Sequence, residues 1–258
     1  FFFQAEDGIR DTSVTGVQTC ALPISEGPSL FTSKTQVTRI PSYPDCELPE
    51  GAEDLEVILA KDNPPEGAIF ATKYLIDRGV FDHIDNAYWS PHMNFKNRVI
   101  FPFYQGDRIV GYTARDITGK SASKYITKSP KKFLHNADKI KTSHKYLIVC
   151  EGIIDAIALD CIAITSNEAS QDQIDYINQF KGEVIVCPDR DKAGEKLIKQ
   201  AQENGWSVSF PMWEDDIKDA ADAIQRYGKL YTLKSIIDAR ISNNTKISVK
   251  DRKSTRLN

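Results

Sequence analysis

The chain has 258 residues, of which 41% are hydrophobic and 27% charged, and its formal net charge is −3. This length is enough for one or two modest domains with a hydrophobic core. No apolar run is long enough to cross a membrane, which excludes an integral membrane protein and leads us to expect no membrane partner.

Both ends of the chain resemble translated sequencing adapter. The peptides QAEDGIRD and VTGVQTCALPI near the start and DRKSTRLN at the end back-translate to such an adapter. We therefore interpret residues 1–25 and 251–258 as non-native and exclude them from the predicted fold. We also expect that the natural gene extends beyond both ends, so that a missing domain carries little meaning.

The first half of the remaining chain has a mixed pattern. Residues 26–54 carry four scattered prolines and are predicted to be a linker. Residues 68–80 have the apolar spacing of a helix, and residues 51–60 suggest another. Residues 97–119 are typical of a β-hairpin, with the turn at Gln105-Gly106-Asp107. This pattern predicts a small α+β subdomain over residues 55–144.

The second half alternates short apolar runs with helical segments, and we predict one domain over residues 145–228. Because the runs are apolar without alternation, both faces of their sheet are expected to be covered, which is typical of a parallel sheet with flanking helices. Residues 229–250 form a further predicted helical segment. The predicted strands are 145–150, 161–166, 183–187 and 206–213, and the two clearest helices are 170–180, with Ser170 as N-cap, and 193–205, ending at Gly205.

The cysteines and histidines of this region lack the spacing of a structural zinc site, because they include no CxxC pair. Cys150, Cys161 and Cys187 lie in the apolar runs. Small buried thiols of this kind are typical of a reducing compartment, so we expect a cytoplasmic protein.

Acidic residues follow two of the predicted parallel strands. Glu151-Gly152 comes after the strand 145–150, and Asp189 and Asp191 come after the strand 183–187. Ligands of open α/β sheets bind at these carboxyl ends, and carboxylates that converge there repel one another unless a cation is present. Oxygen ligands favour Mg²⁺ or Mn²⁺. The alternative is that the two aspartates only form a turn that caps the next helix.

The two segments VCEGIIDAIAL and VCPDRDKAG resemble the signature motifs of the TOPRIM domain, which is shared by DnaG-type primases, topoisomerases and some nucleases. The upstream segments NRVIFPF, GDRIVGYTAR and KYITKSP resemble the subdomain that precedes TOPRIM in DnaG-type primases. The resemblance covers about residues 68–228. It implies that Glu151, Asp189 and Asp191 bind metal, that Asp155 is a supporting catalytic acid, and that Asp219 and Asp222 are further metal ligands.

A basic segment lies between the two groups of motifs. Residues 120–145 contain eight lysines and one acid, Asp138, in a chain that is acidic overall. Such a patch is typical of phosphate binding, although a solvated loop would have the same composition. By the resemblance, we expect nucleotide or template contacts from Arg98, Arg115, Lys124, Tyr125 and Lys128. Tyr125 is either a stacking platform for a base or a packed loop residue.

These features predict the catalytic core of a primase, a nucleotidyltransferase that makes short RNA primers on single-stranded DNA. Its expected ligands are Mg²⁺ or Mn²⁺ and ribonucleoside triphosphates, and its expected partner is a replicative helicase, fused or separate. We expect a phage-encoded protein that acts in the bacterial host cytoplasm. Two alternatives stay open: a metal-dependent TOPRIM nuclease, and a non-catalytic TOPRIM module that binds nucleic acid. A topoisomerase is disfavoured, because nothing resembles its tyrosine-bearing domain.

Overall fold

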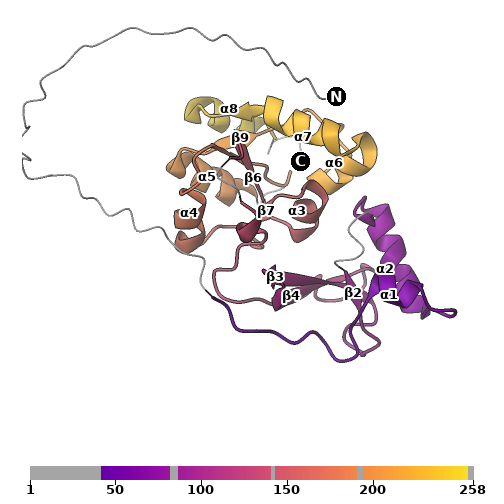
Figure 1. Cartoon of the computed structure of the whole chain (residues 1–258). Coiled ribbons are helices and arrows are strands. Elements are labelled where there is room, and N and C mark those ends of the chain that lie inside the picture. Colours follow the sequence, from indigo (N-terminus) through magenta and orange to yellow (C-terminus); the bar gives the residue numbers. More distant parts are fainter. Residues whose placement is uncertain (1–41, 82–86, 141–142, 191–193, 255–258) are drawn as a thin grey trace, which may run out of the picture. The chain divides into compact units, whose positions relative to one another are not determined.

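The computed structural model describes residues 42–81, 87–140, 143–190 and 194–254, except for the side chains of residues 252–254. The predicted adapter at residues 1–25, the linker up to residue 41 and the predicted metal ligand Asp191 lie outside these ranges. The described chain forms two five-stranded sheets with helices around them, which confirms the predicted α/β class (Figure 1).

The first sheet is antiparallel and belongs to the first half of the chain. Its strands follow one another in the order β1-β2-β3-β4-β5. Two helices, α1 and α2, come from the same segment. The elements are β1 (Glu53–Asp54), α1 (Leu55–Leu59), α2 (Glu66–Asp77), β2 (Tyr88–Trp89), β3 (Arg98–Gln105), β4 (Arg108–Asp116) and β5 (Tyr125–Lys128).

The predicted hairpin is the centre of this sheet. Strands β3 and β4 pair from Arg98↔Asp116 to Gln105↔Arg108, with an irregularity between Phe103 and Tyr104. Gly106 has a φ of +59°, a left-handed conformation that glycine adopts without strain, so the turn forms where the sequence predicts it.

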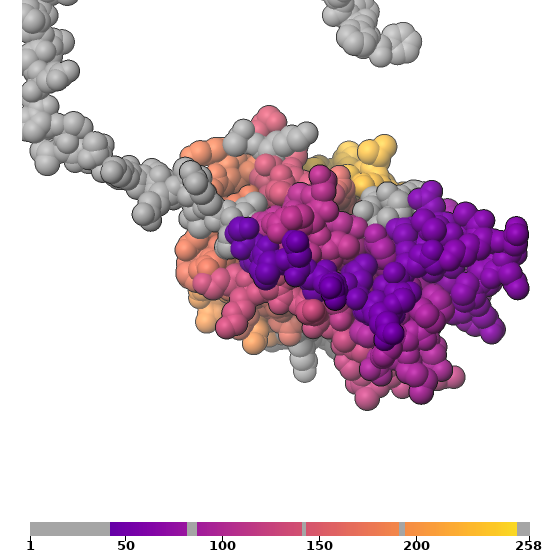
Figure 2. Space-filling model, turned by 60° about the horizontal axis from the view of Figure 1, so that its bottom comes forward, coloured from indigo at the N-terminus to yellow at the C-terminus, as the bar shows by residue number. Residues whose placement is uncertain are grey.

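The sequence predicts a linker over residues 26–54, but its described part is packed on the first sheet. The Cys46 amide donates a hydrogen bond of 2.8 Å to the Ile109 carbonyl. Tyr43 is buried with its ring edge against Phe133. Figure 2 shows this indigo segment lying across the surface of later elements. The linker prediction is therefore wrong from residue 42 onward, because hydrogen bonds and aromatic contacts hold this proline-containing segment on the folded chain.

The second sheet has the order β10-β9-β8-β6-β7, and its four strands from β6 to β9 are parallel. Its edge strand β10 is antiparallel to β9. A short 3-10 helix at Ala137–Lys139 precedes it. The elements are β6 (Tyr146–Cys150), α3 (Ile153–Leu159), β7 (Ile162–Ala163), α4 (Gln171–Ile177), β8 (Glu183–Val186), α5 (Gly194–Asn204), β9 (Ser207–Ser209), α6 (Ala220–Tyr227), α7 (Lys229–Asp238), β10 (Arg240–Ile241) and α8 (Asn244–Ser254).

Strands β6, β7 and β8 contribute side chains to two separate cores. Val149 and Val186 pack in one core with residues of α4, α5 and α8. Ile148 and Ile185 pack in the other core with residues of α3, α6 and α7. Successive strand residues point to opposite faces, so apolar runs without alternation are required here. This confirms the predicted parallel sheet with both faces covered.

The helix ends follow the predicted capping chemistry. Ser170 caps α4 with its hydroxyl on the amide of Gln173, and the Gln173 side chain returns to the Ser170 amide in a capping box. Helix α5 ends at Asn204, before Gly205 with its φ of +71°.

The C-terminal segment differs from its prediction. Residues 229–250 are predicted to be helical, but they also contain the short edge strand β10. Helix α8 continues to Ser254, so the first residues of the excluded range 251–258 are part of a helix. Within the described ranges, no helix is both long enough and apolar enough to cross a membrane.

Candidate active site

Glu151 and Asp189 meet at the carboxyl edge of the parallel sheet. They follow the neighbouring strands β6 and β8, which pair as far as Val149↔Val186. The backbone amide of Asp189 donates a hydrogen bond of 3.3 Å to Glu151 Oε1. A Cβ on Gly194 would lie 2.6 Å from the Asp189 carbonyl oxygen and 3.2 Å from Glu151 Oε1. The start of α5 therefore reaches these acids only because residue 194 is glycine.

Asp155 lies behind this pair, on the first turn of α3, and is buried. Its Oδ1 accepts a hydrogen bond of 2.9 Å from the amide of Ala221 on α6. A Cβ on Gly152 would lie 2.7 Å from its Oδ2, so glycine is needed there as well. Burial raises the pKa of Asp155 well above its usual value, and the negative charges of Asp219 and Asp189 raise this pKa further.

Asp219 and Asp222 stand at the start of α6 and share one arginine. The Asp219 carboxylate caps the helix by accepting a hydrogen bond of 2.8 Å from the Asp222 amide. Arg78, which follows α2, donates from Nη2 to Asp219 over 2.7 Å and from Nη1 to Asp222. The predicted metal ligands at 219 and 222 therefore carry a guanidinium as their cation in this structure.

The acids thus form two groups, Glu151 with Asp189 and Asp219 with Asp222. Asp155 interacts electrostatically with a member of each group. Within the described residues, no group of three or more histidine, cysteine, aspartate or glutamate side chains has an arrangement that could hold a metal ion. Asp191, the third acid of the predicted motif, lies outside those residues. The metal-binding role of Glu151, Asp189 and Asp191 stays a prediction.

Arg115 and Tyr125 form a cation–π pair near the acids. They are direct cross-strand partners on β4 and β5, and the guanidinium carbon lies 4.8 Å from the ring centroid. Burial raises the pKa of Tyr125, the Arg115 charge lowers it, and the Asp155 carboxylate raises it. Tyr125 is therefore within electrostatic reach of Asp155.

The other predicted nucleotide contacts, Lys124 just before β5 and Lys128 at its end, differ in position. The ammonium group of Lys124 lies 5.8 Å from the Tyr125 ring centroid, so it belongs to the same cluster. Lys128 is the last residue of β5, is exposed and pairs with Tyr112. The structure gives Tyr125 partial burial against Arg115, which leaves less of its ring free for a base than the stacking prediction assumes.

Arg98, a predicted phosphate contact, is hydrogen-bonded to the protein itself. It is buried, and its guanidinium donates to Ser121 Oγ over 2.7 Å and to the Ser123 carbonyl over 2.8 Å. It also donates to the carbonyls of Ala114 and Lys124. These contacts hold the segment before β5 against the sheet. The structure therefore makes Arg98 a support for Lys124 and Tyr125, because its donors are directed at the protein.

Two arginines of the site were missed by sequence reasoning. Arg78 follows an ordinary amphipathic helix, and nothing in its local sequence indicates its acidic partners. Arg190 stands between Asp189 and Asp191, and it donates to the carbonyls of Pro211 over 2.7 Å and Glu214 over 3.1 Å. It thereby holds the segment after β9 beside the acids. Its position inside the DxD motif was the available signal.

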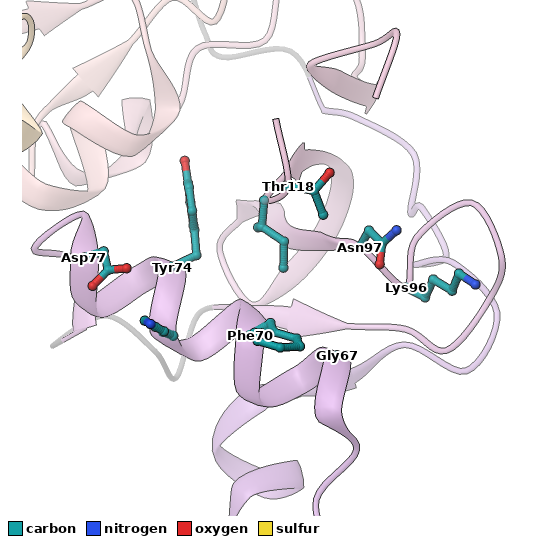
Figure 3. Close-up of a pocket in the computed structure, with 9 residues that line it drawn as sticks. Gly67, Phe70, Tyr74, Asp77, Lys96, Asn97 and Thr118 are labelled. Carbon is teal, nitrogen blue, oxygen red and sulfur yellow. The ribbon is translucent and has the colours of Figure 1, made fainter. Parts of the chain in front are cut away.

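A groove of about 290 Å³ lies on the first subdomain, and none of the carboxylates described above lines it. Figure 3 shows Phe70, Tyr74 and Asp77 of α2 on one side of it and Lys96, Asn97 and Thr118 on the other. Burial raises the pKa of Tyr74, and the charges of Arg115 and Arg78 lower it. Tyr74 is therefore close to both arginines while its ring lines the groove.

Comparison with known proteins shows what this site is similar to. The sequence model of a family described as Toprim-like matches residues 148–224, which contain Glu151, Asp155, Asp189 and Asp219. The DNA primase of Campylobacter jejuni is 29% identical over 127 residues, which are 43% of this chain and 21% of the primase. The DNA primase of Salmonella typhimurium is 25% identical over 178 residues, 60% of this chain and 30% of that one. The chain thus spans less than a third of these relatives.

Solved structures share the fold. The DnaG catalytic core has a TM-score of 0.53 at 20% identity and covers 68% of this chain and 74% of its own. The RNA polymerase domain of the Mycobacterium tuberculosis primase DnaG has a TM-score of 0.55 at 17% identity, with 72% and 79% covered. The DnaG catalytic domain bound to single-stranded DNA has a TM-score of 0.51. Residues 148–224 therefore match a Toprim-like domain, and the described chain shares the fold of the DnaG catalytic core.

Proposed function

We propose that this chain is the catalytic core of a primase that makes short RNA primers on single-stranded DNA. One observation carries the proposal: the buried acid Asp155 lies within electrostatic reach of Tyr125, which forms a cluster with Arg115 and Lys124 on the other sheet. Acids alone are common to Toprim-like proteins of several activities. A polymerase also needs cationic groups beside them for the incoming nucleotide, and Arg115 and Lys124 are suited to that role.

The acids are suited to a divalent cation. The donor set of Glu151, Asp189 and Asp191 is all oxygen, as Mg²⁺ and Mn²⁺ prefer. Burial, and after it the negative charges of Asp219 and Asp189, raise the pKa of Asp155, and a cation bound nearby would offset both effects. When bound, such a cation would neutralise charge on the phosphate oxygens and lower the pKa of an attacking hydroxyl. We propose Glu151, Asp189 and Asp191 as its ligands, with Asp155 in support.

The cationic cluster is suited to the triphosphate. The Nε atom of Arg115 is buried and has no hydrogen-bond partner among the described residues. Buried donors of this kind are rarely left unsatisfied, so a phosphate oxygen is a suitable acceptor for the guanidinium. In primer synthesis a nucleotide 3′-hydroxyl attacks the α-phosphate of a ribonucleoside triphosphate, and pyrophosphate leaves. We assign Arg115 and Lys124 to these phosphates. Lys128, which is exposed at the end of β5, is better suited to contact the template.

The expected partners follow from this reaction. We propose single-stranded DNA as the template, in keeping with the DNA-bound structural relative and with the lysines of residues 120–145. A replicative helicase, fused or separate, stays the predicted protein partner.

The test is primer synthesis without a pre-existing end. The chain is incubated with single-stranded DNA, ribonucleotides and Mg²⁺, with and without a replicative helicase, and the RNA products are resolved on a gel. We expect short RNA from the native chain and none from Asp189→Asn. The matched control is Asp175→Asn, because Asp175 is an exposed acid on α4, and this variant should retain full synthesis.

The same assay separates the primase from a nuclease, because the attacking group differs. A nuclease activates water and would shorten the DNA without making RNA. Metal-dependent DNA cleavage without RNA would overturn the primase proposal and leave the Toprim-like fold intact. DNA binding with neither product, in the presence of the helicase, would favour a non-catalytic module.

A further inference from the structure

Arg78 connects the two halves of the molecule through a pair of acids. Its guanidinium donates to Asp219 Oδ2 over 2.7 Å and to Asp222 Oδ1. The remaining carboxylate oxygens accept backbone amides, Asp219 Oδ1 from Asp222 over 2.8 Å and Asp222 Oδ2 from Lys218 over 3.4 Å. All four oxygens of the pair are therefore occupied by donors from the chain itself.

The paired acids lead directly to the buried acid of the site. Asp219 caps α6, so its position determines where the first amides of this helix point. One of those amides, from Ala221, holds the carboxylate of Asp155 over 2.9 Å. A shift of the start of α6 would therefore move Asp155. A continuous series of polar contacts runs from Arg78 through Asp219 and Ala221 to Asp155.

The packing around Arg78 makes this series rigid. A Cβ on Gly79 would lie 3.3 Å from the Cβ of Gln225, so the end of α2 is in close contact with α6. Ala221 belongs to the same hydrophobic cluster as Leu75 of α2 and Ile154 of α3. The guanidinium is about four-fifths buried, and the two carboxylates are buried to a similar degree. Removing one partner of a largely buried charged pair is strongly destabilising because the other charge stays behind without its partner, so the start of α6 depends on Arg78.

We propose that Arg78 is a positioning residue for the acidic site, which acts through Asp219 and the start of α6 on Asp155. This inference rests on the proposed function, because it assigns to Arg78 the alignment of the acids that would serve nucleotidyl transfer. It also gives Asp219 and Asp222 a different role from the predicted one: they hold an arginine rather than a metal ion. Residues that orient a metal site from outside typically change metal affinity or activity by about 10- to 100-fold when they are lost.

The first experiment measures metal affinity without nucleotide. Mn²⁺ binding to the folded chain is followed by electron paramagnetic resonance for the native protein, Arg78→Gln and Arg78→Lys. We expect a dissociation constant about tenfold higher for Arg78→Gln and an intermediate value for Arg78→Lys, because lysine keeps the charge but lacks the fork that reaches both acids. The control is Arg226→Gln, because Arg226 lies on α6, the helix that Asp219 caps, and pairs with Glu214 at the exposed surface. It should bind Mn²⁺ like the native chain.

A purely structural role predicts a different result. Arg78→Gln would then unfold at a lower temperature but, well below that temperature, bind Mn²⁺ as tightly as the native chain. That outcome would overturn the proposal. Circular dichroism of each variant shows whether it is folded, and Arg78→Lys provides a second substitution if Arg78→Gln does not fold.

A double-mutant cycle separates positioning from direct metal ligation. If Asp222 acts through Arg78, the loss of affinity in Arg78→Gln/Asp222→Asn should equal the larger of the two single losses. If Asp222 is itself a metal ligand, the two losses should multiply, and this result would contradict the proposed role. The cycle uses the same Mn²⁺ measurement, so it does not depend on any primase activity.

Steady-state kinetics then tests how Arg78 acts on the reaction. Loss of positioning should lower kcat for primer synthesis about tenfold with little change in the KM for ribonucleotide. A rise in KM alone would instead indicate a direct phosphate contact and overturn the positioning role. If the native chain makes no RNA, the proposed function fails, whereas the Mn²⁺ results still decide whether Arg78 aligns the acids.

Discussion

The carboxylate of Asp155 accepts a 2.9 Å hydrogen bond from the amide of Ala221, which lies 66 residues further along the chain. This bond holds a buried acid at a position where burial and two neighbouring carboxylates oppose its charge. The arrangement lowers the free energy of unfolding when no cation is bound, and carboxyl groups with strongly shifted pKa values are common at functional sites.

Replacement of Asp155 by Asn should therefore stabilise the metal-free protein. The Asn side chain still offers an oxygen to the Ala221 amide, but it has no charge to bury and takes up no proton on folding, so the cost of keeping a carboxyl in this site disappears. We expect the free energy of unfolding at neutral pH to rise by about 1–3 kcal/mol, measured by urea denaturation in the presence of a chelator. Primer synthesis should fall sharply in the same variant.

The control for this prediction is Asp160→Asn at the end of α3. Its carboxylate is exposed and lies 3.8 Å from Lys139, and asparagine accepts the left-handed backbone found there. Its unfolding free energy should change by less than about 0.5 kcal/mol. A destabilised Asp155→Asn variant would contradict the interpretation of Asp155 as an uncompensated charge.

Arg115→Ala and Lys124→Ala should weaken the binding of single-stranded DNA and of ribonucleotide. Each substitution removes one cation from the cluster around Tyr125. For DNA, the salt dependence of binding should become shallower by about one counterion per lost phosphate contact, measured by fluorescence anisotropy over a range of salt concentrations. Lys199→Ala on the exposed face of α5 is the matched control and should keep the native slope. An unchanged slope in both site variants would mean that neither cation contacts phosphate.

Arg98→Ala should reduce stability far more than a typical surface substitution. It leaves the carbonyls of Ser123, Lys124 and Ala114 without their buried donor. We expect a loss of about 2–4 kcal/mol by denaturant unfolding. Arg108→Ala, which breaks an exposed pair with Asp45, should cost less than about 1 kcal/mol. Native stability in Arg98→Ala, together with weaker ribonucleotide binding, would restore the original prediction of a phosphate contact.

His135 should make the protein less stable in mild acid. Burial among Phe103 and Phe133, and secondarily the charge of Lys139, lower the pKa of His135 to about 3 from its usual 6.5. Below pH 6.5 His135 therefore binds a proton in the unfolded chain but stays neutral in the folded protein. Its stability contribution is complete above pH 6.5 and declines as the pH falls from 6.5 toward 3. Between pH 6.5 and 5 the loss should be about 2 kcal/mol.

The test compares urea unfolding of the native chain and His135→Leu across this pH range. Because other groups also titrate, the difference between the two curves is the relevant quantity. That difference should change by about 2 kcal/mol between pH 6.5 and 5 in favour of the leucine variant. Two parallel curves would show that His135 accepts its proton in the folded state.

Local patterns in the sequence determined the elements of the second sheet and the position of its acids. Continuous apolar runs required a sheet covered on both faces. In the structure Val149 packs into the core on one face and Ile148 into the core on the other. Glu151 and Asp189 follow adjacent parallel strands, and the carboxyl ends of such strands meet at one edge. Their proximity follows from strand order and needs no knowledge of distant contacts.

Only the tertiary structure decided which partners the arginines take. Arg98 and Arg115 are both basic residues on the hairpin, yet Arg98 is buried and donates to carbonyl oxygens of β4 and of the segment before β5, whereas Arg115 lies over Tyr125. Arg78 meets Asp219, 141 residues away in sequence. A guanidinium can bind a carboxylate, a carbonyl, an aromatic ring or a phosphate. The choice among them depends on which groups the packing of α2, α6 and the two sheets brings within reach. The spacing of residues in the local sequence does not reveal that choice.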